Sequence, residues 1–250
     1  VAAPIEAVLL AAAAPEKQIV LFIAGFETLL APLAGMVLEG LPDNLSILLC
    51  GRRVEPLVSE RPQQALAKFD ALLLPGNRCS LVGLVDWESF AASYRKPVAV
   101  AGYTATALLV AIHALLQSLA SGQANLTNCY QPLAKQNGND AAQQRMAAVF
   151  DVVASVWRGV GTIPQSGYRL GDRFACCDAN RRFPDHRHET NGLSEFPEGC
   201  GCASVVSGKE LPESCGGFSL ACRPEHPIGP CMASPEGTCY AQFFANSPMG

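Results

Sequence analysis

The sequence predicts an α/β fold, a parallel sheet with helices on both faces, followed by a C-terminal cysteine-rich domain. Over the first 150 residues, short apolar runs alternate with longer helical patterns. From residue 172 onward Gly, Pro, Ser and Cys dominate, and eight of the 11 cysteines lie between Cys176 and Cys239. Strands that alternate with helices are typical of parallel sheets, whereas a long irregular segment needs something else to organise it.

Four strands are predicted, at residues 18–24, 46–50, 71–74 and 97–101. The first, QIVLFIA, is a continuous apolar run, which suits a strand buried on both faces of a sheet. The third ends at Pro75-Gly76, a dipeptide typical of turns. Helices are predicted at residues 4–14, 29–38, 62–68, 87–94 and 104–119, with a turn at residues 25–28.

A further helix is predicted from residue 140 through Val149 to about Val156. Glycines and Pro164 then indicate a linker with a short strand. We therefore expect an α/β, Rossmann-like domain at residues 1–155, and a linker with the cysteine-rich domain at residues 156–250.

Composition excludes several classes of protein. The 250 residues are 49% hydrophobic and carry a net charge of −4, so the chain is neither a disordered tail nor a protein that binds nucleic acid through a net basic field. The longest apolar stretches, at residues 7–14 and 105–116, are shorter than the roughly 18 residues of a membrane span. No secretory signal is visible, so a cytoplasmic protein is expected.

Polar residues follow the predicted strands, where parallel sheets bind their ligands. Glu27, after Gly25-Phe26, could be a carboxylate of such a site or an acidic first-turn residue favoured by the helix dipole. Arg52 and Arg53 follow the second strand and are expected to be solvated more often than to bind an anion. The segment around Glu27 lacks the glycines of a dinucleotide fingerprint, so no nucleotide is assigned.

Six cysteines lie within 40 residues near the C-terminus. Their spacing fits neither a zinc ribbon, which needs two Cys-x-x-Cys pairs, nor the closely spaced run of a bacterial ferredoxin. Six thiols supply four ligands for a 4Fe-4S cluster and two for a redox pair. The spacing favours iron–sulfur over a structural zinc, and a metal or redox site over a secreted disulfide scaffold. The six are Cys200, Cys202, Cys215, Cys222, Cys231 and Cys239.

This cysteine string resembles the C-terminal signature of the HypD family, which takes part in nickel–iron hydrogenase maturation. The resemblance includes Pro224-Glu225-x-Pro227-x-Gly229-Pro230-Cys231-Met232 and the upstream segments Trp157-Arg158-Gly159-x-Gly161 and Gly25-Phe26-Glu27-Thr28. It covers nearly the whole chain. The family's N-terminal region, with its own iron-binding cysteines, is absent from this sequence.

The resemblance implies two α/β domains around a cleft and a cluster-bearing domain in a cytoplasmic protein. It also implies a role in assembly and cyanation of the Fe(CN)2CO group, as a transfer factor with redox thiols rather than a free-standing enzyme. HypC-like and HypE-like proteins would be partners, and the iron of the group would be held together with a partner. The implied 4Fe-4S ligands are Cys200, Cys215, Cys222 and Cys239, and the implied catalytic residues are Cys202, Cys231 and Glu27. Cys231 and Cys239 could exchange roles.

The sequence departs from the family at three strand ends. Asn77 stands where the family has His, Thr104 stands where it has Glu, and a usual histidine is replaced around Arg52. Cys176-Cys177 is an adjacent pair that the family lacks, so it is left out of the cluster. Two alternatives therefore stay open: a divergent iron–sulfur electron-transfer or thiol-redox module, and a zinc-stabilised, non-catalytic interaction domain.

Overall fold

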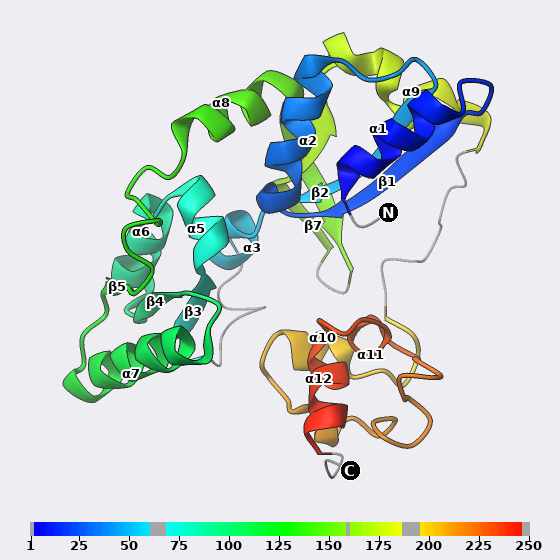
Figure 1. The fold of residues 1–250 in the computed structure, drawn as a ribbon. Helices are drawn as coiled ribbons and strands as arrows, with labels where there is room; N and C mark the ends of the chain where they lie inside the picture. Colours follow the sequence, from blue (N-terminus) through cyan, green and yellow to red (C-terminus); the bar gives the residue numbers. More distant parts are fainter. Residues whose placement is uncertain (1–2, 61–68, 159–160, 187–195, 247–250) are drawn as a thin grey trace. The chain divides into compact units, whose positions relative to one another are not determined.

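The computed structural model describes residues 3–60, 69–158, 161–186 and 196–246. It divides the chain into two compact units. Unit 1 comprises Val1–Pro56, Asp70–Ser155 and Pro164–His188, and unit 2 comprises Leu57–Phe69, Val156–Ile163 and Glu189–Gly250. Unit 1 holds most of the helices and both sheets except the adjoining ends of β6 (Phe150–Trp157) and β7 (Gly161–Leu170), and unit 2 holds six of the cysteines (Figure 1).

The first sheet of unit 1 has the strand order β1-β2-β7-β6. Its strands are β1 (Ile19–Gly25), β2 (Leu45–Arg52), β6 (Phe150–Trp157) and β7 (Gly161–Leu170). The strands β1 and β2 are parallel in the register Ile19↔Leu45, whereas β7 runs antiparallel to β2. The helices α1 (Pro4–Ala13), α2 (Glu27–Glu39) and α8 (Asp140–Val149) pack with this sheet around a core that includes Leu30 and Ile47.

The second sheet has the order β3-β4-β5 and is parallel throughout. Its strands are β3 (Leu72–Pro75), β4 (Val98–Ala101) and β5 (Leu126–Asn128). The helices α5 (Gly76–Val82), α6 (Val85–Tyr94) and α7 (Ala105–Ser121) contact these strands. All four residues of β4 are buried, as expected for the central strand of a parallel sheet covered on both faces.

The mixed α/β class and the parallel pairing of the predicted strands are confirmed. The single sheet was wrong, because the four predicted strands divide between two sheets. Burial of the first strand on both faces was likewise wrong, because buried and exposed residues alternate along β1 and Phe22 is 63% exposed. The helix at residues 150–156 was also wrong: α8 ends at Val149, and these residues form β6. The alternation of exposed and partly buried residues in β6 is that of an edge strand, which pairs only on one side.

Smaller differences concern the ends of elements. Helix α2 begins at Glu27, inside the predicted turn, because Phe26 already has the extended backbone of a helix N-cap. The helix α3 (Glu55–Glu60), α5 and the strand β5 were not predicted. The helix predicted at residues 62–68 lies outside the described residues.

Unit 2 is built from short helices: α10 (Cys202–Val206), α11 (Pro230–Ala233) and α12 (Thr238–Ala245). They enclose a small core that contains Cys202, Cys231, Met232 and Cys239. Sulfur-bearing side chains thus replace most of the aliphatic core that longer helices would supply.

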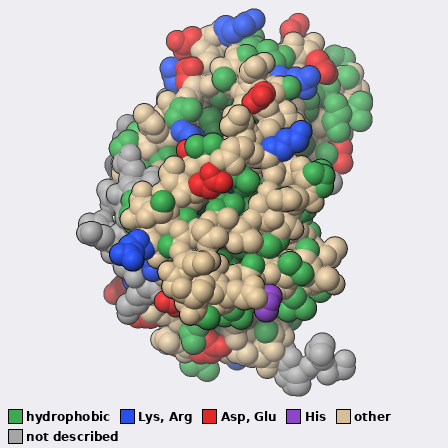
Figure 2. Space-filling model, turned by 90° about the vertical axis from the view of Figure 1, so that its left-hand side faces the viewer, with side chains coloured by type: hydrophobic (Ala, Val, Ile, Leu, Met, Phe, Trp, Pro, Cys, Tyr) green, Lys and Arg blue, Asp and Glu red, His purple; other side chains and the backbone are tan. Residues whose placement is uncertain are grey.

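The surface carries little charge. On the face drawn in Figure 2, the coloured Lys and Arg side chains are few and scattered rather than gathered into a patch. Apolar side chains are exposed on α7, where Leu109 and Leu116 are more than half exposed. Among the described residues, the helices are too short or too polar to cross a membrane.

Candidate functional site

Glu27 lies at the first position of α2, directly after the carboxyl end of β1. A carboxylate is favoured there because the amide dipoles of a helix make its N-terminus positive. Glu27 is nevertheless only 1% exposed, which is rare for a carboxylate without a cationic partner. Its environment therefore has to supply a positive charge.

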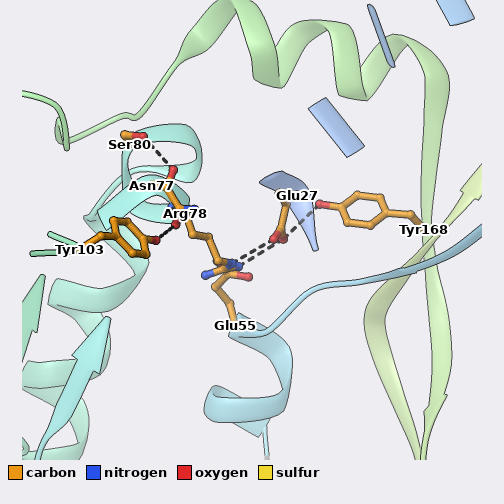
Figure 3. Close-up of polar contacts among 7 residues, drawn as sticks. All are labelled: Glu27, Glu55, Asn77, Arg78, Ser80, Tyr103 and Tyr168. Atoms are coloured by element: carbon orange, nitrogen blue, oxygen red, sulfur yellow. Dashed lines mark hydrogen bonds and ion pairs between the residues drawn. The ribbon is translucent and has the colours of Figure 1, made fainter. Parts of the chain in front are cut away.

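Arg78, in the first turn of α5, supplies that charge (Figure 3). Its Nε donates to Glu27 Oε2 at 3.0 Å, and its Nη2 donates to Glu27 Oε1 at 3.2 Å. The same guanidinium forms an ion pair with Glu55, the first residue of α3. Burial by itself would lower the pKa of Arg78, but Glu55 and Glu27 together raise it, so this group stays charged. One buried cation thus joins the N-terminal residues of two helices.

Tyr168 on β7 completes the surroundings of Glu27. Its hydroxyl donates to Glu27 Oε1 at 3.4 Å (Figure 3). Burial, followed by the charge of Glu27, raises the pKa of Tyr168, so its hydroxyl remains a hydrogen-bond donor. Glu27 therefore accepts bonds from two sides of the site, which fixes its orientation.

A pocket of about 630 Å³ opens beside this network. Glu27, Glu55 and Tyr168 lie in its wall, and Arg53, Asp86 and Gln143 contribute further polar groups. Apolar side chains from α8 and β6, among them Met146 and Phe150, line the rest. The expectation that Glu27 faces a ligand-sized space stays a prediction, and the geometry is compatible with it.

The two arginines at the end of β2, Arg52 within the strand and Arg53 after it, have backbone partners. Arg52 Nη1 donates to the carbonyl of Gly51 at 3.0 Å, and Arg53 Nη1 donates to the carbonyl of Gln165 at 3.2 Å. Arg53 also lies in the wall of the pocket. Arg53 is therefore half-buried beside the pocket rather than fully solvated.

Two of the altered strand-end residues have local structural roles. Asn77 Oδ1 accepts from the backbone N–H of Arg78 at 2.7 Å and from the hydroxyl of Tyr103 (Figure 3). Thr104 is the N-cap of α7, where its hydroxyl accepts from the N–H of Ala107 at 3.1 Å. Both residues stabilise helix starts, and neither titrates near neutral pH.

In unit 2, the six C-terminal cysteines lie close together. Cys202, Cys231 and Cys239 lie together in the small core, and Cys200 packs against them. Cys222 packs against the same small core. Cys202 and Cys231, which were expected to form a redox pair, thus lie in the same buried core.

Backbone amides point at two of the sulfurs. The N–H of Gly201 donates to Cys215 Sγ at 3.4 Å, and the N–H of Ile228 donates to Cys222 Sγ at 3.3 Å. Amide donors, first that of Gly201 and then that of Gly217, lower the pKa of Cys215. Burial raises the pKa of Cys200 and of Cys239 to about 11 in each case.

Gly229 allows the sulfurs to approach the backbone. A Cβ at this position would overlap the sulfurs of Cys200 and Cys202. Unit 2 therefore offers several soft sulfur donors, amide donors directed at sulfur, and a glycine that makes room for both. This donor set fits a thiolate-bound metal group.

The described residues do not, however, form a ready metal site. No three His, Cys, Asp or Glu side chains among them are arranged as ligands of one metal ion. All 11 cysteines are free thiols. The ligand set of Cys200, Cys215, Cys222 and Cys239 accordingly remains a prediction.

Arg78 and Tyr168 were missed at the sequence level. Arginine is usually exposed, so no local pattern marks a buried one. The available signal was the position of Arg78, three residues after β3 and in the first turn of a helix, where parallel sheets place ligand-contacting residues. Tyr168 lies on an antiparallel strand that was predicted only as a short segment.

Known proteins with similar sequences are named for hydrogenase maturation or formation. A family model described as HypD, hydrogenase formation hypA family, matches residues 1–246. The hydrogenase maturation factor HypD of Cupriavidus necator is 31% identical over 239 residues, which are 92% of this chain and 62% of that protein. A putative hydrogenase expression/formation protein of Methanocaldococcus jannaschii is 32% identical over 94% of this chain and 65% of its own length. The hydrogenase maturation factor HypD of Rhizobium leguminosarum bv. viciae is 32% identical over 96% of this chain and 64% of its own length. The chain thus spans less than two thirds of these relatives.

Proposed function

Because this chain belongs to the HypD family, we propose that it acts as a maturation factor in the assembly and cyanation of the Fe(CN)2CO group of nickel–iron hydrogenases. It would act as a transfer factor with redox thiols and would need other proteins to complete the reaction. The observation that carries the proposal is the gathering of six cysteine thiols in unit 2.

Four of these thiols, Cys200, Cys215, Cys222 and Cys239, are the proposed ligands of a 4Fe-4S cluster. When bound, such a cluster supplies single electrons. The amides of Gly201 and Ile228 would stabilise negative charge on the sulfurs of Cys215 and Cys222. Gly229 keeps space open beside Cys200.

Cys202 and Cys231 are the proposed redox pair. Because both lie in the same small core, a disulfide would form between them if an electron acceptor took two electrons from the thiols, with release of two protons. Both residues are buried, which limits reaction with thiols in solution. We assign this chemistry to the cytoplasm, where free thiols persist.

Glu27 is proposed as the fixed carboxylate of the pocket in unit 1. Arg78 holds it from one side and Tyr168 from the other, so it presents a constant orientation to a ligand. A fixed charge lowers the cost of reorganisation when a polar partner binds. HypC-like and HypE-like proteins are the proposed partners, and the iron of the Fe(CN)2CO group is the proposed cargo.

A second candidate is a thiol-redox or electron-transfer module that has lost the cargo chemistry. It is favoured by Asn77 and Thr104, which fill two strand-end positions with residues that do not titrate near neutral pH. A non-catalytic interaction domain that is stabilised by zinc remains the third alternative, and metal analysis distinguishes it from the other two.

The first test is anaerobic purification with analysis of iron, sulfide and zinc. About four irons and four sulfides per chain are expected for a cubane site. Cys222→Ser should lose most of that iron, whereas Cys50→Ser in unit 1 should retain it. One zinc without iron would support the third alternative and contradict the proposal.

The second test measures partner binding. The chain, joined to the N-terminal region of a longer relative, is expected to co-purify with HypC-like and HypE-like proteins. If the protein carries its cluster but binds neither partner, the redox module is favoured over the maturation factor.

A further inference from the structure

Unit 1 contains a pair of thiols that the proposed function does not use. Cys176 and Cys177 are adjacent in the 3-10 helix η1 (Asp172–Cys177). Cys176 is exposed and Cys177 is buried. The thiol of Cys177 donates to the carbonyl of Phe174 at 3.3 Å, which orients its sulfur. One thiol is therefore open to solvent, and its neighbour is held in place.

Both cysteines line the same pocket, which has a volume of about 430 Å³. The end of α2, the following loop and the start of β2 contribute apolar side chains to its lining, namely Val37, Leu41 and Leu45. Phe174 adds an aromatic ring to the lining. The pocket is large enough for an aromatic ring and chemically suited to one.

A charged side chain also lines this pocket. Arg182 belongs to its lining, and its Nη1 donates to the carbonyl of Asp43 at 2.7 Å. Its Nη2 donates to Gln18 at 2.7 Å. These contacts occupy donors of the guanidinium, and Asp43 also belongs to the lining, so the pocket offers a ligand sulfur and apolar surface beside two charged residues.

Two adjacent thiols bind a thiophilic centre more tightly than one. Once the first sulfur has bonded, the second bond forms within the same molecule, at a high effective concentration. Soft centres prefer sulfur over the oxygen and nitrogen donors of other side chains. We propose that Cys176 and Cys177 form a dithiol site that binds a soft thiophilic centre through both sulfurs, with its apolar substituent seated in the pocket.

Trivalent arsenic with an aryl substituent is a probe that matches this description. With phenylarsine oxide, two As–S bonds form and the As–O bonding is lost. The two thiol protons leave with the oxygen as one molecule of water, and no electron is transferred. The reaction therefore needs no oxidant or reductant.

The test is peptide mapping after the native full chain has reacted with phenylarsine oxide. Trypsin cleaves after Arg173 and after Arg181, so the peptide of residues 174–181 contains both cysteines and no other. The expected result is one phenylarsine group on this peptide. It should withstand washing with a monothiol and be removed by a dithiol, as expected for attachment through two sulfurs.

Variants separate this site from reaction at other thiols. Cys176→Ser should abolish the monothiol-resistant adduct on the peptide, and Cys129→Ser should leave it unchanged. Because Cys176 is exposed, its substitution leaves the fold intact, which circular dichroism checks. An adduct that withstands monothiol in Cys176→Ser, or its absence from the native wild-type chain, would overturn the proposal.

The role of the pocket is tested by competition. Inorganic arsenite offers the same centre without the apolar group, so phenylarsine oxide should displace it from residues 174–181. Equal retention of the two compounds would show that the pocket contributes nothing and would reject that part of the proposal.

Discussion

Arg78 binds both carboxylate oxygens of Glu27 through two separate nitrogens, although 51 residues separate the two in sequence. This bidentate pair connects the start of α5, beside the second sheet, with the start of α2, beside the first. The side chains are 7% and 2% exposed, so water does not replace either partner. The two halves of unit 1 are therefore joined by a contact that tolerates little change in geometry.

The first prediction concerns the stability of this ion pair. Arg78→Met should lower the free energy of unfolding by about 3–5 kcal/mol, because it leaves the carboxylates of Glu27 and Glu55 without their buried cation. Denaturant titration followed by circular dichroism measures the change. Arg181→Met is the control, since Arg181 pairs with Asp172 on the surface and should matter little.

A double variant tests the cause. Combining Arg78→Met with Glu27→Gln removes one of the stranded charges, so it should be less unstable than Arg78→Met alone. If Arg78→Met is as stable as Arg181→Met, the ion pairs of Arg78 with Glu27 and Glu55 do not stabilise the fold as described.

The same region shows what sequence patterns can and cannot provide. The apolar runs of β1 and β4 both predicted strands, but only β4 is buried throughout, whereas Val20 and Phe22 of β1 are exposed. An apolar run therefore indicates a strand without indicating how many of its faces are covered. The division into two sheets depends on which strands pair, and no local period encodes that choice. The ion pair of Arg78 with Glu27 likewise depends on tertiary structure, and helix propensity says nothing about it.

The strand β6 illustrates a second limit. Its sequence, FDVVASVW, continues directly from α8, and a short apolar run suits a helix or a strand. Pairing in the first sheet decides the outcome. In unit 2 the opposite holds: cysteine spacing identified the thiols that lie together, because few other residue types could form the core of so short a segment.

The second prediction concerns Cys79, which neighbours Arg78 and is 1% exposed. Burial raises the pKa of its thiol to about 11, although the charge of Arg78 opposes this shift. The unfolded chain therefore loses this proton at lower pH than the folded protein does. The contribution of this group to the free energy of unfolding should be fully present below the unfolded pKa and should be lost as the pH rises toward 11, by up to about 3 kcal/mol.

Cys79→Ala isolates that contribution. The substitution costs some stability at every pH through lost packing, but it removes the thiol that titrates. The difference in unfolding free energy between wild type and variant should therefore shrink from pH 7 to pH 10. A difference that is constant over this range would show that Cys79 does not cause the alkaline loss.

The third prediction compares two glycines. A Cβ at Gly35 in α2 meets no atom within 4 Å, so Gly35→Ala should raise the free energy of unfolding by about 0.5–1 kcal/mol. A Cβ at Gly51 would lie 2.9 Å from Leu30 Cδ1 and 3.1 Å from Tyr168 Cβ. Gly51→Ala should therefore cost about 1–3 kcal/mol. Thermal unfolding measures both, and a stabilised Gly51→Ala would contradict the close packing of β2 against Tyr168.

The fourth prediction concerns Gly229 and links the structure of unit 2 to its proposed cluster. Gly229→Ala places a methyl group where the sulfurs of Cys200 and Cys202 lie, so at least one thiol must move. The metal-free variant should lose about 1–3 kcal/mol of stability, as expected for overpacking. After anaerobic reconstitution it should also hold less iron and sulfide per chain than wild type.

Gly216→Ala is the matched control, because a Cβ there meets nothing within 4 Å. It lies beside the proposed ligand Cys215, so it tests whether any added methyl group near a ligand disturbs loading. If the two variants hold equal amounts of iron, the added methyl group at Gly229 has no specific effect on cluster binding. If only Gly229→Ala loses iron, cluster binding requires the space beside the sulfurs of Cys200 and Cys202. The comparison is direct because both variants add one methyl group to unit 2.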